Sequence, residues 1–218
     1  MAGSAVISNS DNAARPEGTF AGNINKVLHK SLEEHSNLVL GGQLIKYGFA
    51  GLTTGIYEKY PERFITYPVA EELMNSSAMG LALAGKRVLM FHVRLDFLLC
   101  GMNSLCNHIP IWWKKGHKLP ITIIAQEGRG IGSGQGAQHS KDFTFWFQRF
   151  EGWNVAVPQD PDEAGTLLRS AIDGDKPTLY VLHRRLFDAT TGTRIVIPQE
   201  VRLCGASRRH VREFYGED

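Results

Sequence analysis

Short apolar runs alternate with segments of helical periodicity along most of the chain. The apolar runs end at turn-forming residues and predict strands over 38–40, 87–92, 120–125, 153–157 and 178–182, with a further strand leading into Pro68. Apolar residues at helical spacing predict helices over 23–35, 71–83, 96–113, 141–149 and 160–172. Strands that alternate with helices are typical of a mainly parallel sheet covered on both faces, so we expect a three-layer αβα fold.

The two ends of the chain lack this pattern. Residues 1–22 are rich in Ser, Asn, Ala and Gly and show no periodicity, so we expect a disordered N-terminal segment. Residues 23–187 carry the alternation and are interpreted as one domain. Residues 188–218 contain too few apolar residues for a second core and are interpreted as a C-terminal tail.

Composition excludes several classes of protein. The formal net charge is +2, and the basic residues are scattered except near the C-terminus, which does not indicate a nucleic-acid surface. No apolar run has the length of a membrane span, and the first residues do not resemble a signal peptide. Cys100, Cys106 and Cys204 lack metal-ligand spacing and are interpreted as buried thiols in a reducing compartment. We therefore expect a cytoplasmic protein that binds neither nucleic acid nor membrane.

Glu71 lies where a predicted strand gives way to a helix. In a parallel sheet this junction is at the carboxyl edge, where α/β proteins bind ligands. An acid in the first turn of a helix also interacts favourably with the helix dipole, so position alone does not give Glu71 a function.

Four motifs, taken in their order along the chain, resemble one family. They are Pro-Val-Ala-Glu ending at Glu71, Ala-Gly-Lys-Arg ending at Arg87, Asp96-Phe97, and Gly-Gln-Gly-Ala-Gln-His-Ser ending at Ser140. Together they resemble the pyrimidine-binding domain of thiamine diphosphate enzymes, most nearly the β subunit of 2-oxoacid dehydrogenases and more loosely transketolase. The resemblance covers about residues 23–187, and we expect the C-terminal domain of that family to be missing.

The resemblance implies roles for four residues. The Glu71 carboxyl would hydrogen-bond N1′ of the aminopyrimidine ring and favour its imino tautomer, which requires a dry cleft and a pKa raised by desolvation. Phe97 would pack on the face of that ring, and Val69 would line the same cleft. His139 would face the substrate and exchange protons with it.

Other polar residues are open to more than one interpretation. Glu72 should point elsewhere on the helix than Glu71. Gln138, beside His139, is a further candidate for substrate contact. Arg94 and Asp96 are suited to binding a phosphate, a carboxylate or a sugar hydroxyl, and equally to forming an internal ion pair. The remaining histidines considered are interpreted as structural: His92, His108, His117 and His183.

The sequence does not predict a metal site on this chain. Its glycine-rich stretch 128–136 does not have phosphate-loop or dinucleotide spacing, and we interpret it as a loop that delivers His139. The Gly-Asp-Gly motif with a downstream Asn, which holds the diphosphate through a divalent metal in this superfamily, does not occur; Asp173-Gly174-Asp175 is interpreted as a turn after a helix. The resemblance therefore implies that an α-type partner subunit holds the diphosphate and Mg²⁺, in an α₂β₂ heterotetramer.

The departures from the family shape the expected function. Gly42 stands where the dehydrogenase β subunits have a glutamate near the reaction centre. The missing domain contributes, in the relatives, to dimer contacts and to docking the lipoyl acyltransferase core. We therefore expect a two-component enzyme that decarboxylates a 2-oxo acid and transfers the acyl unit to a small acceptor. The alternatives are transketolase-type transfer of a two-carbon ketol unit and a non-catalytic partner domain.

Overall fold

The computed structural model describes residues 13–127, 139 and 141–194, apart from the side chain of residue 185. Within these ranges one sheet has the strand order β2-β1-β3-β4-β6-β5, and every neighbouring pair of strands is parallel. The strands are β1 (Leu38–Gly42), β2 (Phe64–Thr66), β3 (Arg87–His92), β4 (Ile121–Glu127), β5 (Asn154–Ala156) and β6 (Thr178–His183).

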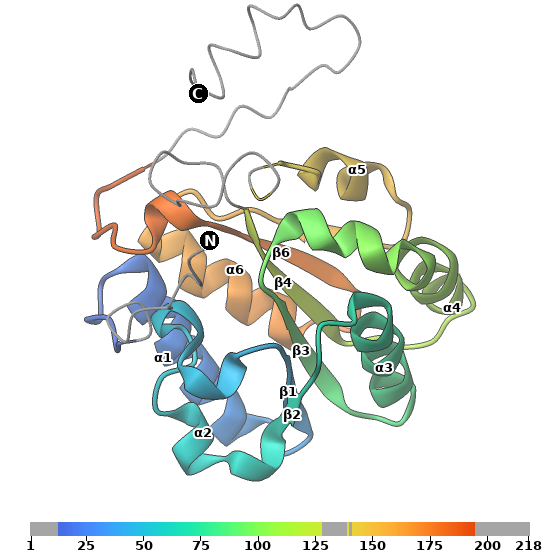
Figure 1. Ribbon diagram of the computed structural model, residues 1–218, viewed down its shortest axis with the longest axis horizontal. Helices are drawn as coiled ribbons and strands as arrows, with labels where there is room; N and C mark the ends of the chain where they lie inside the picture. The colour runs from blue at the N-terminus through green and yellow to red at the C-terminus, as the bar shows by residue number, and fades with distance from the viewer. Residues whose placement is uncertain (1–12, 128–138, 140, 195–218) are drawn as a thin grey trace, which may run out of the picture.

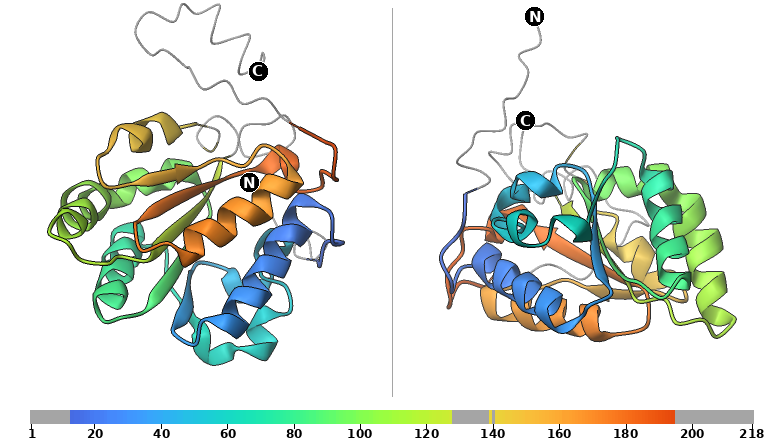
Figure 2. Two further views of the ribbon diagram at one scale, coloured as in Figure 1. Left: turned by 180° about the vertical axis from the view of Figure 1, so that it is seen from behind. Right: turned by 90° about the horizontal axis from the view of Figure 1, so that it is seen from below.

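Helices cover both faces of this sheet, so the predicted three-layer fold is confirmed. Helices α1 and α6 lie on one face, and α3, α4 and α5 lie on the other (Figures 1 and 2). Because both faces are covered, β1, β4 and β6 are buried along their whole length, which is why they read as continuous apolar runs. The α-helices are α1 (Phe20–Glu34), α2 (Ile56–Lys59), α3 (Glu71–Leu83), α4 (Ile109–Lys114), α5 (Thr144–Arg149) and α6 (Pro161–Asp173).

Two apolar cores, one on each face, join the layers. Alternate residues of a strand point to opposite faces, so neighbours along β3 belong to different cores. Leu89 and Phe91 pack with α1 and α6, whereas Val88 and Met90 pack with α3. This alternation decides which polar residues at the strand ends share a face with α3.

Helix α1 begins at Phe20, three residues before the predicted start at residue 23. The Thr19 hydroxyl caps it by accepting a hydrogen bond from the Gly22 N–H at 3.1 Å. Phe20 and Ala21 are fully buried, and the Phe20 ring stacks on that of Phe187. The early start therefore depends on a contact with the far end of the domain, and the division of the chain at residues 23 and 188 stays a prediction.

The helix-like stretch predicted over 96–113 is helical, but it is not one continuous α-helix. The segment is a 3₁₀ helix (Leu95–Gly101), a π-helix (Asn103–His108) and then α4. Gly101 lies against α3, where a Cβ atom would be 2.3 Å from Asn75 Nδ2 and 3.1 Å from the Glu71 carbonyl oxygen. Gly101 thus approaches α3 closely where the 3₁₀ helix gives way to the π-helix. The apolar periodicity of the sequence does not reveal this change of helix type.

The expectation of buried cysteines is wrong for Cys100, which is exposed; Cys106 is half-buried. Burial raises the pKa of the Cys106 thiol. Cys204 lies outside the described residues. Across the ranges that the structure describes, no helix combines the length and the apolar character that a membrane crossing needs.

Gly42 ends β1 with a φ of +150°, and a Cβ atom there would lie 2.6 Å from the Phe91 carbonyl oxygen. This backbone conformation favours glycine, and the contact leaves no space for a side chain. A glutamate in place of Gly42 therefore requires a different path for the end of β1.

We expect Gly42→Ala to lower the free energy of unfolding by about 1 to 3 kcal/mol, because it adds both backbone strain and a clash with β3. Urea unfolding of the two proteins measures this loss. Gly80→Ala is the matched control: a Cβ on Gly80, within α3, meets no atom within 4 Å. That control should gain up to about 1 kcal/mol, because alanine is the better helix former. Equal stabilities of the Gly42→Ala and parent proteins would contradict the argument.

Candidate functional site

Glu71 is the first residue of α3, at the carboxyl edge of the sheet, and its side chain is half-exposed. No hydrogen bond or ion pair joins its carboxylate to another residue in the described ranges. Glu71 lies at the N-terminal, positive end of the α3 dipole. Glu71 therefore offers a carboxylate that the surrounding protein does not use.

Glu72 has different surroundings, as predicted. Its carboxylate accepts hydrogen bonds from Ser104 Oγ at 2.5 Å, from the Ser104 N–H at 3.3 Å and from Asn103 Nδ2 at 3.3 Å. Burial of Glu72 opposes ionisation, but these hydrogen bonds together lower its pKa. Glu72 thus ties α3 to the π-helix (Asn103–His108).

Phe97 and His139, predicted from separate motifs, lie side by side. Their ring centroids are 5.3 Å apart and their planes meet at 81°, an edge-to-face contact. Phe97 is only partly buried. Gln138, the neighbour of His139, lies outside the described residues.

Val69 and Leu73 are apolar side chains on either side of Glu71, and this chain leaves them uncovered. Val69 is 80% exposed and Leu73 is 52% exposed. The chain therefore leaves two apolar side chains uncovered near the start of α3.

Asp96 connects the 3₁₀ helix to the segment that follows His139. Its Oδ1 accepts a hydrogen bond from the Lys141 N–H at 3.1 Å. Burial raises the pKa of Asp96, although the bond from Lys141 and the nearby His139 oppose this. Asp96 Oδ2 is buried and has no partner among the described residues.

Asn75 and His92 form a buried pair one turn into α3. His92 Nε2 lies 2.9 Å from Asn75 Oδ1. Burial lowers the pKa of His92 to about 3, so its ring is neutral at ordinary pH. A neutral Nε2–H donates to the amide oxygen, and the pair fixes the start of α3 against the end of β3.

Three polar residues lie at or just beyond the ends of the neighbouring strands β3, β4 and β6, and we call Arg94, Glu127 and His183 the polar row. Glu127 and His183 are register partners, and His183 Nδ1 lies 2.7 Å from Glu127 Oε2. Arg94 has extended backbone two residues beyond His92, and Glu127 is two residues beyond Ala125, the partner of His92. All three residues are buried, with 3%, 0% and 6% of their surface exposed.

Sequence reasoning named one member of this row, Arg94, as a candidate for substrate contact and missed the other two. His183 was interpreted as structural, and Glu127 was not singled out. A signal was available, because both residues end buried apolar runs and so fall at the carboxyl edge of a parallel sheet.

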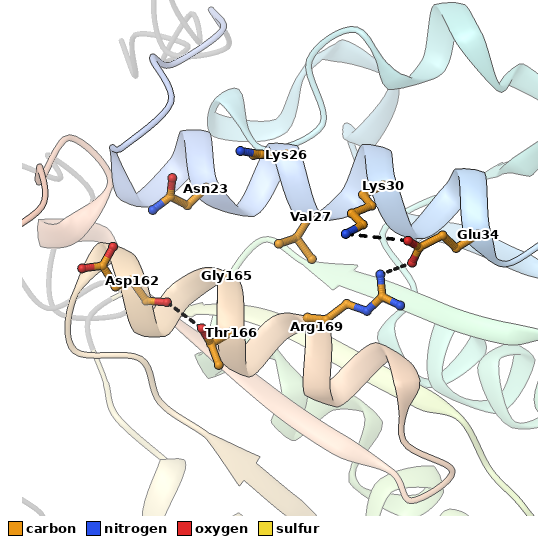
Figure 3. A pocket seen from close by; sticks show the side chains of 9 residues that line it. All are labelled: Asn23, Lys26, Val27, Lys30, Glu34, Asp162, Gly165, Thr166 and Arg169. Carbon is orange, nitrogen blue, oxygen red and sulfur yellow. Dashed lines mark hydrogen bonds and ion pairs between the residues drawn. The ribbon is translucent and has the colours of Figure 1, made fainter.

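A hollow on the opposite face of the sheet is separate from this site. It lies between α1 and α6, where Lys30 and Arg169 both pair with Glu34 (Figure 3). Gly165 allows the two helices to approach, since a Cβ there would already touch Val27 at 3.5 Å. The hollow shares no residue with the Glu71 site.

Among the residues described, no group of three His, Cys, Asp or Glu side chains is arranged to hold a metal ion. Asp173 ends α6 and Gly174 follows it as the cap, so the Asp-Gly-Asp stretch is a turn, as predicted. Asp175 pairs with Arg87 and Lys118 at the other edge of the sheet.

A parallel sheet with helices on both faces, a carboxylate heading α3 and an aromatic ring beside a histidine at the same edge define a ligand-binding α/β domain. The family described as "Transketolase, pyrimidine binding domain" matches residues 19–189, and the chain belongs to this family of thiamine diphosphate-dependent proteins. The resemblance seen in the four motifs is thereby confirmed.

Curated relatives include pyruvate dehydrogenase E1 component subunits beta. The chain is 30% identical over 172 residues to that of Chaetosphaeridium globosum, covering 78% of this chain and 52% of the relative. It is 26% identical over 168 residues to the mitochondrial subunit of Homo sapiens, covering 75% and 47%. The chain thus spans about half the length of the curated relatives it matches.

A solved structure titled "Split gene transketolase, inactive beta4 tetramer" superimposes with a TM-score of 0.61. The match has 21% sequence identity and covers 74% of this chain and 50% of that one. At this identity the likeness shows the fold alone.

Proposed function

We propose that this chain is the β-type subunit of a two-component thiamine diphosphate enzyme that decarboxylates a 2-oxo acid and transfers the acyl unit to a small acceptor. The observation that carries the proposal is the Glu71 carboxylate, which heads α3 and has no partner in the described chain. Its neighbour Glu72 is fully engaged by Ser104 and Asn103. Of the two adjacent acids, only Glu71 is free to bind a ligand.

The surroundings of Glu71 fit an aminopyrimidine ring. Glu71 would bind and share a proton with the ring nitrogen N1′, and Phe97 would pack against the ring face. Val69 and Leu73 are exposed apolar side chains near the start of α3. When bound, the cofactor would supply a carbon nucleophile for the carbonyl carbon of a 2-oxo acid. His139, in contact with Phe97, would exchange a proton with the substrate.

A partner subunit is part of the proposal. The half-exposure of Glu71 and the exposed Val69 and Leu73 favour a site completed by a second surface. We assign the diphosphate and Mg²⁺ to an α-type partner, in an α₂β₂ heterotetramer, and expect the lone chain to be inactive. The free and exposed thiol of Cys100 is typical of a reducing compartment and supports a cytoplasmic location; some relatives are named as mitochondrial.

Calorimetric titration of thiamine diphosphate with Mg²⁺ tests the proposed interfacial site. We expect saturable binding to an equimolar mixture of this chain and its α-type partner, and none to either polypeptide alone. The same titration with Mg²⁺ alone controls for metal binding. Association of the two chains without any cofactor binding would contradict the enzyme proposal and favour a non-catalytic partner domain.

The donor substrate distinguishes the two proposed reactions, which are decarboxylation of a 2-oxo acid with acyl transfer and transketolase-type ketol transfer. Pyruvate and related 2-oxo acids should release CO₂ with the loaded pair. Cleavage of ketose phosphates without CO₂ release would instead identify transketolase-type ketol transfer.

A further inference from the structure

We propose that the polar row is a substrate subsite in which His183, oriented by Glu127, contacts a hydroxyl or carbonyl oxygen of a small substrate through Nε2. This inference rests on the proposed function and adds to it a second histidine, distinct from His139. The subsite lies at the same sheet edge as Glu71, but on strands β4 and β6.

The sheet itself brings the row together. Register partners in a parallel sheet point their side chains to the same face, so Glu127 and His183 lie side by side. Ala125 and Val181, two residues earlier on these strands, pack in the core that includes Met74 and Ala78 of α3. The row therefore lies on the α3 face, the face that also carries Phe97 and the Asn75–His92 pair.

Glu127 determines how the His183 ring is used. A fully buried carboxylate 2.7 Å from Nδ1 accepts the Nδ1–H hydrogen bond and fixes the orientation and tautomer of the ring. The lone pair of the neutral ring is then on Nε2. That atom is buried, on a side chain only 8% exposed, and has no partner among the described residues. An oriented imidazole with an unused nitrogen is suited to accept a hydrogen bond or a proton from a substrate oxygen.

Two further buried atoms at this edge support a ligand over a purely internal pair. Asp96 Oδ2 and His139 Nδ1 have no partner among the residues described. Buried polar atoms in folded proteins are usually hydrogen-bonded. Within the described ranges, atoms without a partner also occur away from this edge, at Ser31 and Arg87, but here three of them lie at the edge that carries Glu71 and are available to a polar ligand. A purely structural Glu127–His183 pair explains the hydrogen bond of Nδ1. It does not explain why Nε2 is buried without a partner.

The charged side chains around the row are of both signs. Burial of Arg94 and the positive charge of Arg184 lower the pKa of Arg94, while Asp96 and Glu127 oppose this change. A 2-oxo acid has a carbonyl oxygen for His183 Nε2 and a carboxylate of the kind that guanidinium groups bind.

Two isosteric changes of His183 separate its two nitrogens. In His183→Asn the amide NH₂ replaces the Nδ1 donor to Glu127 and Nε2 is deleted. In His183→Gln the amide reaches the position of Nε2 and the donor to Glu127 is lost. In the enzyme reconstituted with its α-type partner, we expect His183→Asn to lower kcat/KM for pyruvate and acetaldehyde by 10²- to 10⁴-fold. Its thermal transition and cofactor affinity should stay close to the parent values.

The pH profile provides a readout that a structural pair would not change. The pH dependence of kcat/KM should change in His183→Asn, which deletes the ring, and in Glu127→Gln, which removes the charged acceptor of the Nδ1–H hydrogen bond. His117→Asn, an exposed site against Trp112, is the matched control and should keep the parent rates and profile. Parent-like kcat/KM and pH profile in His183→Asn would overturn the proposal. If His183→Asn does not fold, the rates of Glu127→Gln and the nuclear magnetic resonance experiment described next test the subsite instead.

Nuclear magnetic resonance tests the contact without turnover. In the Glu71→Gln complex with ¹⁵N-labelled histidine, pyruvate should shift the His183 Nε2 resonance, and acetaldehyde alone should not if the subsite serves the donor. A shift with acetaldehyde but not with pyruvate would assign the subsite to the acceptor. No shift with either compound would overturn the proposed subsite. A shift of the His183 resonance without CO₂ release by the parent pair would support the subsite and contradict the proposed reaction. CO₂ release without such a shift would support the proposed reaction and contradict the subsite.

Discussion

Replacing Glu71 with glutamine should lower CO₂ release from pyruvate by the reconstituted enzyme by about 10²- to 10⁴-fold. Glutamine keeps the size of the side chain at the head of α3 and can still hydrogen-bond a ring nitrogen, but it cannot share a proton with that nitrogen. Since Glu71 has no partner in the described chain, the change breaks no internal bond. Steady-state rates, with cofactor affinity measured separately, distinguish lost chemistry from lost binding.

Glu72→Gln is the control within the same helical turn. Glu72 accepts hydrogen bonds from Ser104 and Asn103, so its replacement should lower the free energy of unfolding by about 1 kcal/mol. Its effect on CO₂ release should be less than about tenfold. If Glu72→Gln abolished activity and Glu71→Gln did not, the assignment of the two acids would have to be reversed.

Acid should destabilise this chain through His92, well above the pH at which most carboxylates titrate. The folded-state pKa of His92 is about 3, whereas an unfolded histidine has a pKa of about 6.5. Below pH 6.5 the unfolded chain therefore binds a proton that the folded chain does not. Above pH 6.5 His92 does not change the free energy of unfolding. As the pH falls from 6.5 toward 3, His92 lowers this free energy by about 1.4 kcal/mol per pH unit. Urea unfolding between pH 7 and pH 4.5 measures the slope.

His92→Gln isolates this contribution. The glutamine amide can still donate to Asn75 Oδ1 but does not titrate. The slope of the unfolding free energy against pH should therefore lose the contribution of about one bound proton. Asp96 acts in the opposite direction, because burial raises its pKa and the folded chain keeps that proton to higher pH. Since Asp96 is present in both proteins, the difference between their slopes belongs to His92. Equal slopes would contradict the buried, neutral assignment of His92.

The site was predictable where its residues are defined by local sequence. Glu71 follows a proline at a strand-to-helix junction, and the helix does begin there. Phe97 and His139 were drawn from two distant motifs by resemblance, and the fold brings their rings into contact. The position of Glu127 and His183 at the ends of apolar runs was visible in the sequence, but their pairing was not, because it depends on the register between β4 and β6.

Sequence alone determined the layers, the strand positions and the placement of Glu71, because burial on both faces and helical amphipathicity leave periodic apolar patterns in each segment. Tertiary structure decided the rest. It placed Gly42 against the Phe91 carbonyl, paired Asn75 with His92, and aligned Arg94, Glu127 and His183 along three strand ends. These contacts join segments far apart in the chain, and strand order and register, which set them, depend on the packing of the whole domain.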